Sequence, residues 1–162
     1  MTNFDFSARL VAVCKQKGLT VGTAESCTGG GVAAAITDVA GCSAAFAGGL
    51  VTYTNELKME LLGVPSDVIA THSEVSHACA REMAIGARAR LGVSIALSTT
   101  GYAGPTGGSE RDRVGTVYIG VATAGDCFTE RFSAPKGADR AAVRAAAVER
   151  ALELALQVAE LL

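Results

Sequence analysis

Residues 19–31 read LTVGTAESCTGGG, and this stretch decides the fold predicted for the chain. Its start, Leu19-Thr20-Val21, predicts a strand over about residues 20–24. The glycines that follow open an Ala-, Ile- and Val-rich segment, which predicts a helix to about Val39. Ser26 and Cys27 are therefore expected at a strand-to-helix turn. Backbone N–H groups at such a turn point outward and bind anions or developing oxyanions.

Helices and strands are predicted to alternate along the rest of the chain. Helices are expected from Phe6 to Gly18, over 55–62, from Ser73 or Ser76 to Gly92 and from about Asp139 onward. Strands are expected within 44–54, 93–99, 114–124 and 127–133. The last two strands meet across Gly125-Asp126, which is a hairpin signal. Early alternation followed by a hairpin predicts an α/β fold, a three-layer α/β/α single domain over residues 1–162 with a mixed sheet.

Composition excludes several classes of protein. The chain has 162 residues, of which 49% are hydrophobic and 19% charged, so a folded domain with a full core is expected. The net charge is −2, and an acid interrupts the densest basic stretch, Arg111-Asp112-Arg113, so no nucleic-acid groove is expected. No apolar run approaches the roughly 18–20 residues of a membrane span, and no signal peptide is seen, which predicts a cytoplasmic protein without membrane contact.

The cysteines and histidines do not predict a metal site. Five cysteines are present without a Cys-x-x-Cys pair, which indicates reduced and mostly buried thiols. His72 and His77 lie five residues apart, and no cysteine or carboxylate stands at metal-ligand spacing around them. They are expected in a surface loop and at a helix start.

Ser26 and Lys58 are the candidate catalytic pair, 32 residues apart. A serine hydroxyl needs a neighbouring base, and Lys58 can be that base only if its pKa is lowered enough to leave the amine neutral. Cys27 is a rival nucleophile, because a helix N-terminus lowers the pKa of a thiol. In an extended segment only one of Ser26 and Cys27 would face a pocket. Thr28 could instead cap the helix. The two residues of the pair also fit ordinary surface side chains.

A second glycine-rich loop, GYAGPTGG at 101–108, follows the strand that ends in Ser98-Thr99-Thr100. Ligands bind beyond the carboxyl ends of strands in open α/β sheets. If both glycine-rich segments leave the same sheet edge, Ser26, Thr100 and this loop would surround one crevice. Lys136 and Arg140 lie near the start of the last helix, where an arginine suits a phosphate, although both also fit solvated charges. The glycines equally fit plain tight turns.

These segments together resemble the CinA C-terminal domain family, the stand-alone nicotinamide-nucleotide amidases. The resemblance covers nearly the whole chain, and several motifs in order are far more specific than one glycine turn. They are TAESCTGG at 23–30, VTYTNE at 51–56 with Lys58, LLGV at 61–64, EVS at 74–76, GYAGPTGGS at 101–109, VGTVY at 114–118 and DRAAVR at 139–144.

The resemblance implies hydrolysis of the carboxamide of nicotinamide mononucleotide to nicotinate mononucleotide and ammonia, with no metal or organic cofactor. It implies Ser26 as nucleophile and Lys58 as base of a Ser/Lys dyad. Tyr53 and Thr100 would assist proton transfer or position the amide. Arg140 would hold the nucleotide, and the glycine turns would supply oxyanion and phosphate contacts through Thr28, Gly29, Gly30, Gly104 and Gly107.

Two departures from the family pattern leave substrate preference open. Tyr102 stands where the family often has an aliphatic residue, and Arg111-Asp112-Arg113 replaces a more usual Lys-Pro ending of the loop.

The alternatives to a nicotinamide-nucleotide amidase are a nucleotide-binding or regulatory module with little turnover, an amidase for another carboxamide and, least favoured, a factor acting on DNA. The Ala- and Gly-rich helices predict close packing against a symmetry mate, so a homodimer or larger homo-oligomer is expected.

Overall fold

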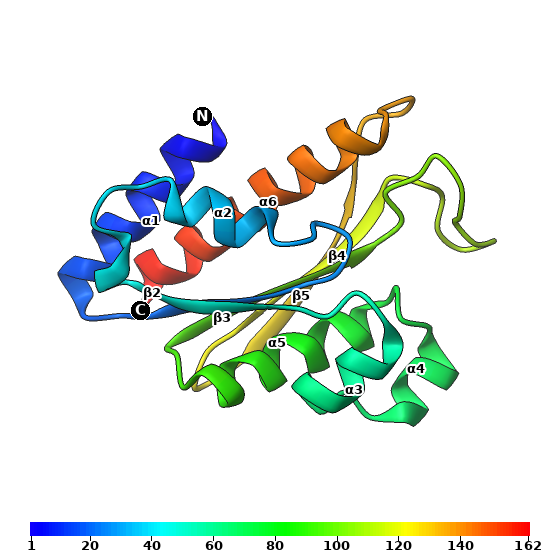
Figure 1. Ribbon diagram of the computed structural model, residues 1–162, viewed down its shortest axis with the longest axis horizontal. Coiled ribbons are helices and arrows are strands. Elements are labelled where there is room, and N and C mark those ends of the chain that lie inside the picture. The colour runs from blue at the N-terminus through cyan, green and yellow to red at the C-terminus, as the bar shows by residue number, and fades with distance from the viewer.

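The computed structural model describes residues 1–162 without a gap (Figure 1). The helices are α1 (Asn3–Lys17), α2 (Gly31–Thr37), α3 (Asn55–Leu62), α4 (Ser66–His72), α5 (His77–Leu91) and α6 (Arg140–Leu161), with a short 3₁₀ helix, η1 (Cys42–Ala44). The strands are β1 (Val21–Glu25), β2 (Phe46–Val51), β3 (Ile95–Gly101), β4 (Thr116–Ala122) and β5 (Cys127–Ser133). None of the helices combines the length and the apolar character needed to cross a membrane.

The five strands form one mixed sheet in the order β2-β1-β3-β4-β5. β1 runs parallel to both β2 and β3, whereas β4 pairs antiparallel with β3 and β5. Glu25 at the end of β1 lies opposite Thr99 on β3. The turn after β1 and the loop after β3 therefore leave the same edge of the sheet, which is the condition under which Ser26, Thr100 and the second glycine-rich loop would surround one crevice.

Helices cover both faces of the sheet (Figure 1). α1, α2 and α6 pack together on one face, and α3, α4 and α5 pack on the other. A buried apolar cluster fills each interface, the larger one around Leu97 and Leu152 and the smaller one around Met83 and Ala96. The predicted three-layer α/β/α arrangement with a mixed sheet is confirmed.

Local signals in the sequence set most helix ends. Thr2 and Asp5 form a capping box at the start of α1, and Gly18 in the left-handed conformation ends that helix. Of the two serines predicted to cap α5, it is Ser76 that accepts a hydrogen bond from the N–H of Cys79, at 3.1 Å. These caps satisfy backbone groups that a helix end leaves without partners.

The structure differs from the sequence prediction in one missed helix and at several element ends. α4 was not predicted, because its seven residues are too few to show a helical period. α2 ends at Thr37, short of Val39. β4 begins at Thr116 rather than at 114, because Gly115 has a φ of 93° and its N–H donates to the carbonyl of Tyr102 in the preceding loop.

A close contact between α3 and α5 helps to position the site. A Cβ atom on Gly86 of α5 would overlap the carbonyl oxygen of Leu62 at the end of α3. Only glycine therefore allows the two backbones to approach this closely. α3 carries Lys58, so the contact fixes the helix that supplies the candidate base.

Candidate functional site

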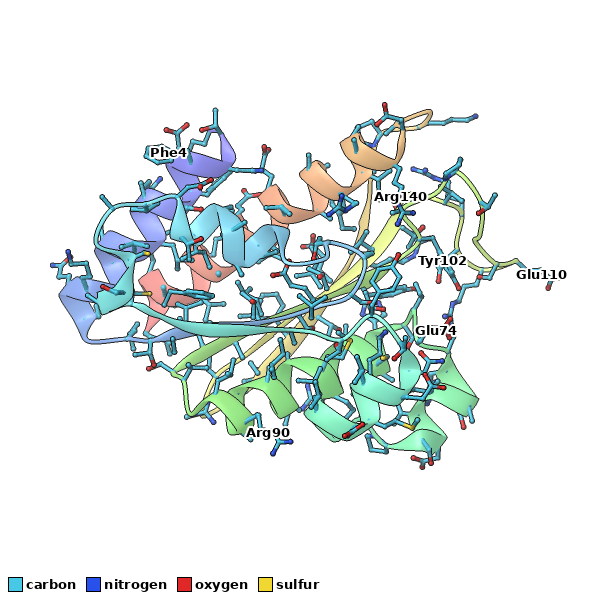
Figure 2. The ribbon with its side chains drawn as sticks, viewed as in Figure 1. Phe4, Glu74, Arg90, Tyr102, Glu110 and Arg140 are labelled. Atoms are coloured by element: carbon cyan, nitrogen blue, oxygen red, sulfur yellow. The ribbon has the colours of Figure 1, made fainter.

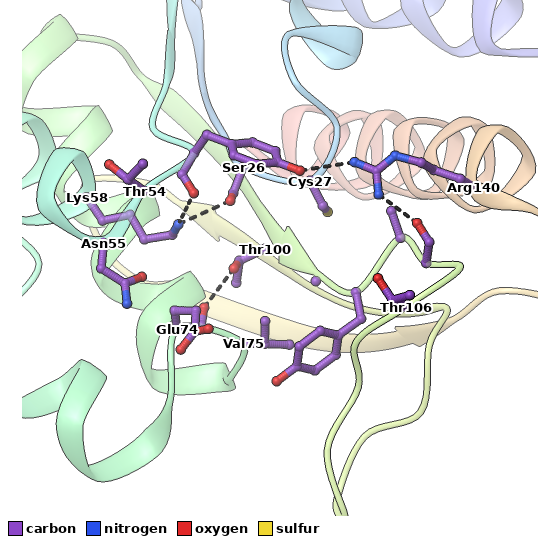
Figure 3. Close-up of a pocket in the computed structure, with 15 residues that line it drawn as sticks. Ser26, Cys27, Thr54, Asn55, Lys58, Glu74, Val75, Thr100, Thr106 and Arg140 are labelled. Carbon is purple, nitrogen blue, oxygen red and sulfur yellow. Dashed lines mark hydrogen bonds between the residues drawn. The ribbon is translucent and has the colours of Figure 1, made fainter.

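A polar cleft with a volume of about 360 Å³ opens at the sheet edge where β1 and β3 end (Figure 3). This volume lies within the roughly 300–1,000 Å³ of small-molecule sites. Fifteen residues line the cleft: Ser26, Cys27, Tyr53, Thr54, Asn55, Lys58, Glu74, Val75, Thr100, Gly101, Tyr102, Ala103, Gly104, Thr106 and Arg140. The predicted site residues Ser26, Tyr53, Lys58, Thr100, Gly104 and Arg140 are all among them.

Ser26 and Lys58 meet at the base of the cleft. Lys58 Nζ lies 3.1 Å from Ser26 Oγ, and it also donates to the carbonyl oxygens of Thr52 at 3.1 Å and Tyr53 at 3.4 Å. Ser26 sits directly after β1, and its N–H donates to the carbonyl of Thr99 on β3 at 2.9 Å. The sheet therefore fixes the hydroxyl, and α3 fixes the amine beside it.

The surroundings of Lys58 favour its neutral form. Lys58 is only 1% exposed, and no carboxylate forms an ion pair with it. Burial lowers the pKa of its amine below the ordinary 10.5, while the negative charges of Glu74 and Glu56 act in the opposite direction. Removing an ammonium from water without a counter-ion is costly, so the cleft promotes the form of Lys58 that accepts a proton.

The glycine-rich turn after β1 has a different role from the one predicted. The carboxylate of Glu25, 1% exposed, accepts hydrogen bonds from the N–H groups of Val32 at 2.8 Å and Ala33 at 3.0 Å. It also accepts one from the hydroxyl of Thr28 at 2.7 Å. The N-terminus of α2 is therefore already occupied by a side chain of the protein, and it is not an anion site.

Thr28, Gly29, Gly30 and Gly107 do not line the cleft. Thr28 is fully buried, and its hydroxyl lies between Glu25 and Thr99. Nor does Thr28 cap α2, since the residue at the N-cap position is Gly30, without a side-chain bond. The predicted contacts of these residues with a substrate find no support in their positions, because their backbone and side chains shape the turn and loop instead.

Cys27 does not have the activated thiol that its place in the sequence suggested. Burial is the main cause that raises the pKa of Cys27 to about 12. Its side chain belongs to the large apolar cluster, and the residue is 5% exposed. Both Ser26 and Cys27 line the cleft, contrary to the expected alternation, because the chain turns after Glu25 and is no longer extended. A buried thiol of raised pKa is a poor nucleophile.

Arg140, at the start of α6, lies at the end of the cleft opposite Lys58. Its guanidinium donates to the carbonyl of Gly104 at 2.7 Å and to the hydroxyl of Tyr53 at 3.0 Å. Tyr53 is 56% exposed, and its hydroxyl contacts Arg140 rather than Ser26 or Lys58, although its carbonyl contacts Lys58. Figure 2 shows Arg140 and Tyr102 at the same end of the molecule. A cation held in this way suits a phosphate.

The motif Arg111-Asp112-Arg113 anchors the loop between β3 and β4. Asp112 is fully buried and pairs with Arg111 at 3.0 Å and Arg131 at 2.8 Å, and the hydroxyl of Tyr118 donates to it at 3.0 Å. Burial acts to raise the pKa of Asp112, but the hydrogen bonds from the two arginines and Tyr118 bring it below the usual range. This motif thus stabilises the loop that forms one wall of the cleft, and Tyr102 of the same loop lines the cleft.

Thr100 and Glu74 form the remaining polar wall. The hydroxyl of Thr100 donates to the carbonyl of Glu74 at 2.7 Å, which leaves its oxygen free only to accept a hydrogen bond. Sequence reasoning gave no role to Glu74, although the motif EVS at 74–76 contained it. Nothing in the local sequence shows that a turn between α4 and α5 reaches the end of β3. No group of three or more His, Cys, Asp and Glu side chains is arranged to hold a metal ion.

Comparisons with known proteins agree with the geometry. The family described as the CinA C-terminal domain matches residues 3–159. The nicotinamide-nucleotide amidohydrolase PncC of Escherichia coli is 50% identical over 129 residues, 78% of each chain. A CinA-like protein of Citrifermentans bemidjiense is 51% identical over 132 residues, 82% of this chain and 32% of that protein. The chain thus spans about a third of the length of the CinA-like relative.

Solved structures share the whole fold. A competence-damaged protein (CinA) superfamily protein from Klebsiella pneumoniae 700603 has a TM-score of 0.94 and 34% identity, and the match covers all of both chains. A competence/damage inducible protein from Agrobacterium tumefaciens has a TM-score of 0.91 and 37% identity, over 96% of this chain and 95% of that one.

Proposed function

The chain belongs to the CinA C-terminal domain family, and from this premise we propose that it is an amidase that converts nicotinamide mononucleotide to nicotinate mononucleotide and ammonia. The observation that carries the proposal is the 3.1 Å contact between Ser26 Oγ and the buried amine of Lys58. The name of the Escherichia coli relative supports the choice of substrate. The proposed reaction uses no cofactor.

Lys58 acts as the base that activates Ser26. A neutral amine has two N–H groups and one lone pair. The carbonyls of Thr52 and Tyr53 are placed to accept the two N–H groups, which turns the lone pair toward the hydroxyl of Ser26. As Oγ attacks the amide carbon, the proton of the hydroxyl moves to Nζ.

The tetrahedral oxyanion needs donors, and the nearest backbone offers one. The N–H groups of Val32 and Ala33 are bound to Glu25, so they cannot serve. The N–H of Cys27 donates to no backbone carbonyl or side chain, and Cys27 lines the cleft next to Ser26. We assign the oxyanion contact to this N–H, a kind of contact worth about 2.7–4 kcal/mol in known enzymes.

Protonated Lys58 then donates its proton to the departing nitrogen, and ammonia leaves with the C–N bond pair. This step produces an acyl ester on Ser26 and restores the neutral amine. Water attacks the ester with Lys58 again as base, which releases nicotinate mononucleotide. Thr100 accepts a hydrogen bond from the amide, and Tyr53 contributes by holding Arg140.

Arg140 binds the phosphate. Two of its N–H groups are bound to Gly104 and Tyr53, which orients the guanidinium while the rest of the group faces the cleft. The preference of arginine for phosphate comes from its planar set of donors. The substrate thus lies with its carboxamide at Ser26 and its phosphate at Arg140.

Ammonia release from nicotinamide mononucleotide tests the proposal. Wild type and Lys15→Ala, which changes an exposed lysine of α1, should both release ammonia, whereas Ser26→Ala and Lys58→Ala should release none above background. Turnover that survives in Ser26→Ala would refute the dyad. A wild type that binds the nucleotide in a calorimetric titration but releases no ammonia would identify a binding or regulatory module instead.

An amidase for another carboxamide is the second candidate. Tyr102 favours it, because this residue lines the cleft at a position where the family resemblance implies an aliphatic residue. A panel of amides in which another substrate has a higher kcat/KM than the mononucleotide would establish this alternative. Cytoplasmic location, the extent of one domain and a homodimer or larger assembly stay predictions from the sequence.

A further inference from the structure

Three charged side chains line the cleft, and the proposed mechanism uses only two of them. Lys58 and Arg140 have roles, whereas Glu74 has none. Glu74 is the one carboxylate in the lining, and it forms no ion pair with any basic residue of the protein. An unpaired carboxylate in a binding cleft leaves a negative charge available to a ligand.

The backbone holds Glu74 firmly in place. Ser73, just before it, has φ 77° and ψ 156° and is the only residue other than glycine with a positive φ in the chain. This region of backbone space is almost restricted to glycine, so a serine there is strained. The hydroxyl of Thr100 donates a hydrogen bond to the carbonyl of Glu74, and the hydroxyl of Ser73 donates one to the carboxylate of Glu74 at 3.1 Å.

Arg111 adds a second restraint on the same turn. Its guanidinium donates to the carbonyl of His72 at 3.2 Å and to that of Val75 at 2.9 Å, on either side of Ser73 and Glu74. Residues with a strained backbone that neighbouring contacts hold in place are often found at functional sites. The contacts hold the backbone of Glu74 beside Thr100, in the wall of the cleft.

We infer that Glu74 selects substrates with a positively charged ring, a role that rests on the proposed function and narrows its substrate class to N-substituted pyridinium carboxamides. The ring nitrogen of nicotinamide mononucleotide is bonded to ribose, so the ring carries a positive charge, while the phosphate is negative. Figure 3 shows Arg140 at one end of the cleft and Glu74 toward the other end, on the same side as Ser26 and Lys58. With the carboxamide at Ser26 and the phosphate at Arg140, the charged ring lies on the side of the cleft that holds Glu74, so each protein charge is on the side of the ligand charge of opposite sign.

The aromatic residues of the cleft support the same preference. Tyr53 and Tyr102 both line it, and the face of an aromatic ring attracts a cation. A neutral carboxamide of the same shape would gain nothing from Glu74. It would instead remove water from that carboxylate without replacing the lost interaction.

Calorimetric titration tests the inference in a variant that cannot turn over substrate. The protein is Ser26→Ala, with and without Glu74→Gln, and the two ligands are nicotinamide mononucleotide and its reduced form, whose dihydropyridine ring is uncharged. Glu74→Gln should raise the Kd of the charged ligand about tenfold, as expected for a partly exposed charge pair, and change that of the neutral one less than twofold. Glu74→Asp should keep at least a threefold preference for the charged ring.

The double variant Ser26→Ala and Glu56→Gln is the matched control. The charge of Glu56, like that of Glu74, acts to raise the pKa of Lys58, but Glu56 does not line the cleft. It should change neither Kd by more than twofold. Equal losses for both ligands in Glu74→Gln would overturn the inference, since Glu74 would then contact the amide or only shape the cleft. No loss for either ligand would overturn it too. Ammonia release by wild type is measured separately, so failure of the proposed reaction is distinguished from failure of this charge selection.

Discussion

Replacing Glu25 by glutamine tests how the turn that carries Ser26 is stabilised. The two carboxylate oxygens of Glu25 are used by different backbone groups. Oε1 accepts from Val32 and from the hydroxyl of Thr28, and Oε2 accepts from Ala33 and, at 3.3 Å, from the hydroxyl of Thr23. Glutamine has nearly the same size but turns one oxygen into an NH₂ group. In either orientation of the amide, one N–H of α2 then faces another donor.

The contacts set the size of the effect. A hydrogen bond to a charged group contributes about 1.5–3 kcal/mol, and a buried donor without a partner costs about 1–3 kcal/mol. One backbone N–H loses its acceptor in Glu25→Gln, and the bonds that remain are no longer charge-assisted. We expect the free energy of unfolding to fall by about 2–4 kcal/mol, from a total that is typically about 5–15 kcal/mol. Urea unfolding followed by circular dichroism at pH 7 measures it.

Glu149→Gln is the control, because Glu149 is exposed on α6 and makes no hydrogen bond through its side chain. It should change the free energy of unfolding by less than about 0.5 kcal/mol. A loss in Glu25→Gln as small as in this control would refute the argument that the carboxylate fixes the start of α2. Ammonia release per folded molecule should also fall in Glu25→Gln, since the displaced turn carries the nucleophile.

Three more predictions follow from the same contacts. The fold lowers the pKa of Lys58, so the unfolded chain binds more protons than the folded chain between that pKa and 10.5. The free energy of unfolding of wild type, relative to that of Lys58→Met, should therefore rise with pH across this window. Urea unfolding at pH 7 and pH 10.5 would contradict this if the difference stayed constant or fell. Arg140→Ala should lower kcat/KM about 10–100-fold for the mononucleotide and less than threefold for nicotinamide riboside, which lacks the phosphate, because about 1.5–3 kcal/mol of charged contact is lost; equal losses would contradict the phosphate contact. Asp112→Asn should lower the free energy of unfolding by about 1–3 kcal/mol, because Arg111 and Arg131 lose their buried partner. A change below about 0.5 kcal/mol in a denaturant titration would show that the loop is held by other contacts.

Several elements could be predicted because their signals are local. The hairpin of β4 and β5 follows from Gly125-Asp126 between two segments that predict strands, and α1 and α5 end before Gly18 and Gly92. The sequence placed one crevice beyond the first and third strands on the condition that both glycine-rich segments leave the same sheet edge, and the parallel pairing of β1 and β3 meets this condition. α4 carries no such signal, since it has seven residues, and it was missed.

The site was predicted in part. The positions of Ser26 and Thr100 at strand ends put them at one crevice, provided that both glycine-rich segments leave the same sheet edge, whereas the family resemblance added Arg140 to the site. It assigned the glycine turn to a ligand, whereas the carboxylate of Glu25 already binds the N–H groups of Val32 and Ala33. Such a competition between a ligand and a side chain depends on the path of the turn, which composition and spacing do not specify.

By itself, the sequence determined the order of the longer helices and of the strands, and it supplied the chemical groups available for a site, because periodicity, caps and glycines act over a few residues. Only the tertiary structure decided which groups are reactive. It placed the amine of Lys58 3.1 Å from Ser26 and buried it, and it raised the pKa of Cys27 to about 12. The physical reason is that a pKa depends on burial and on charges brought close by segments far apart in the chain.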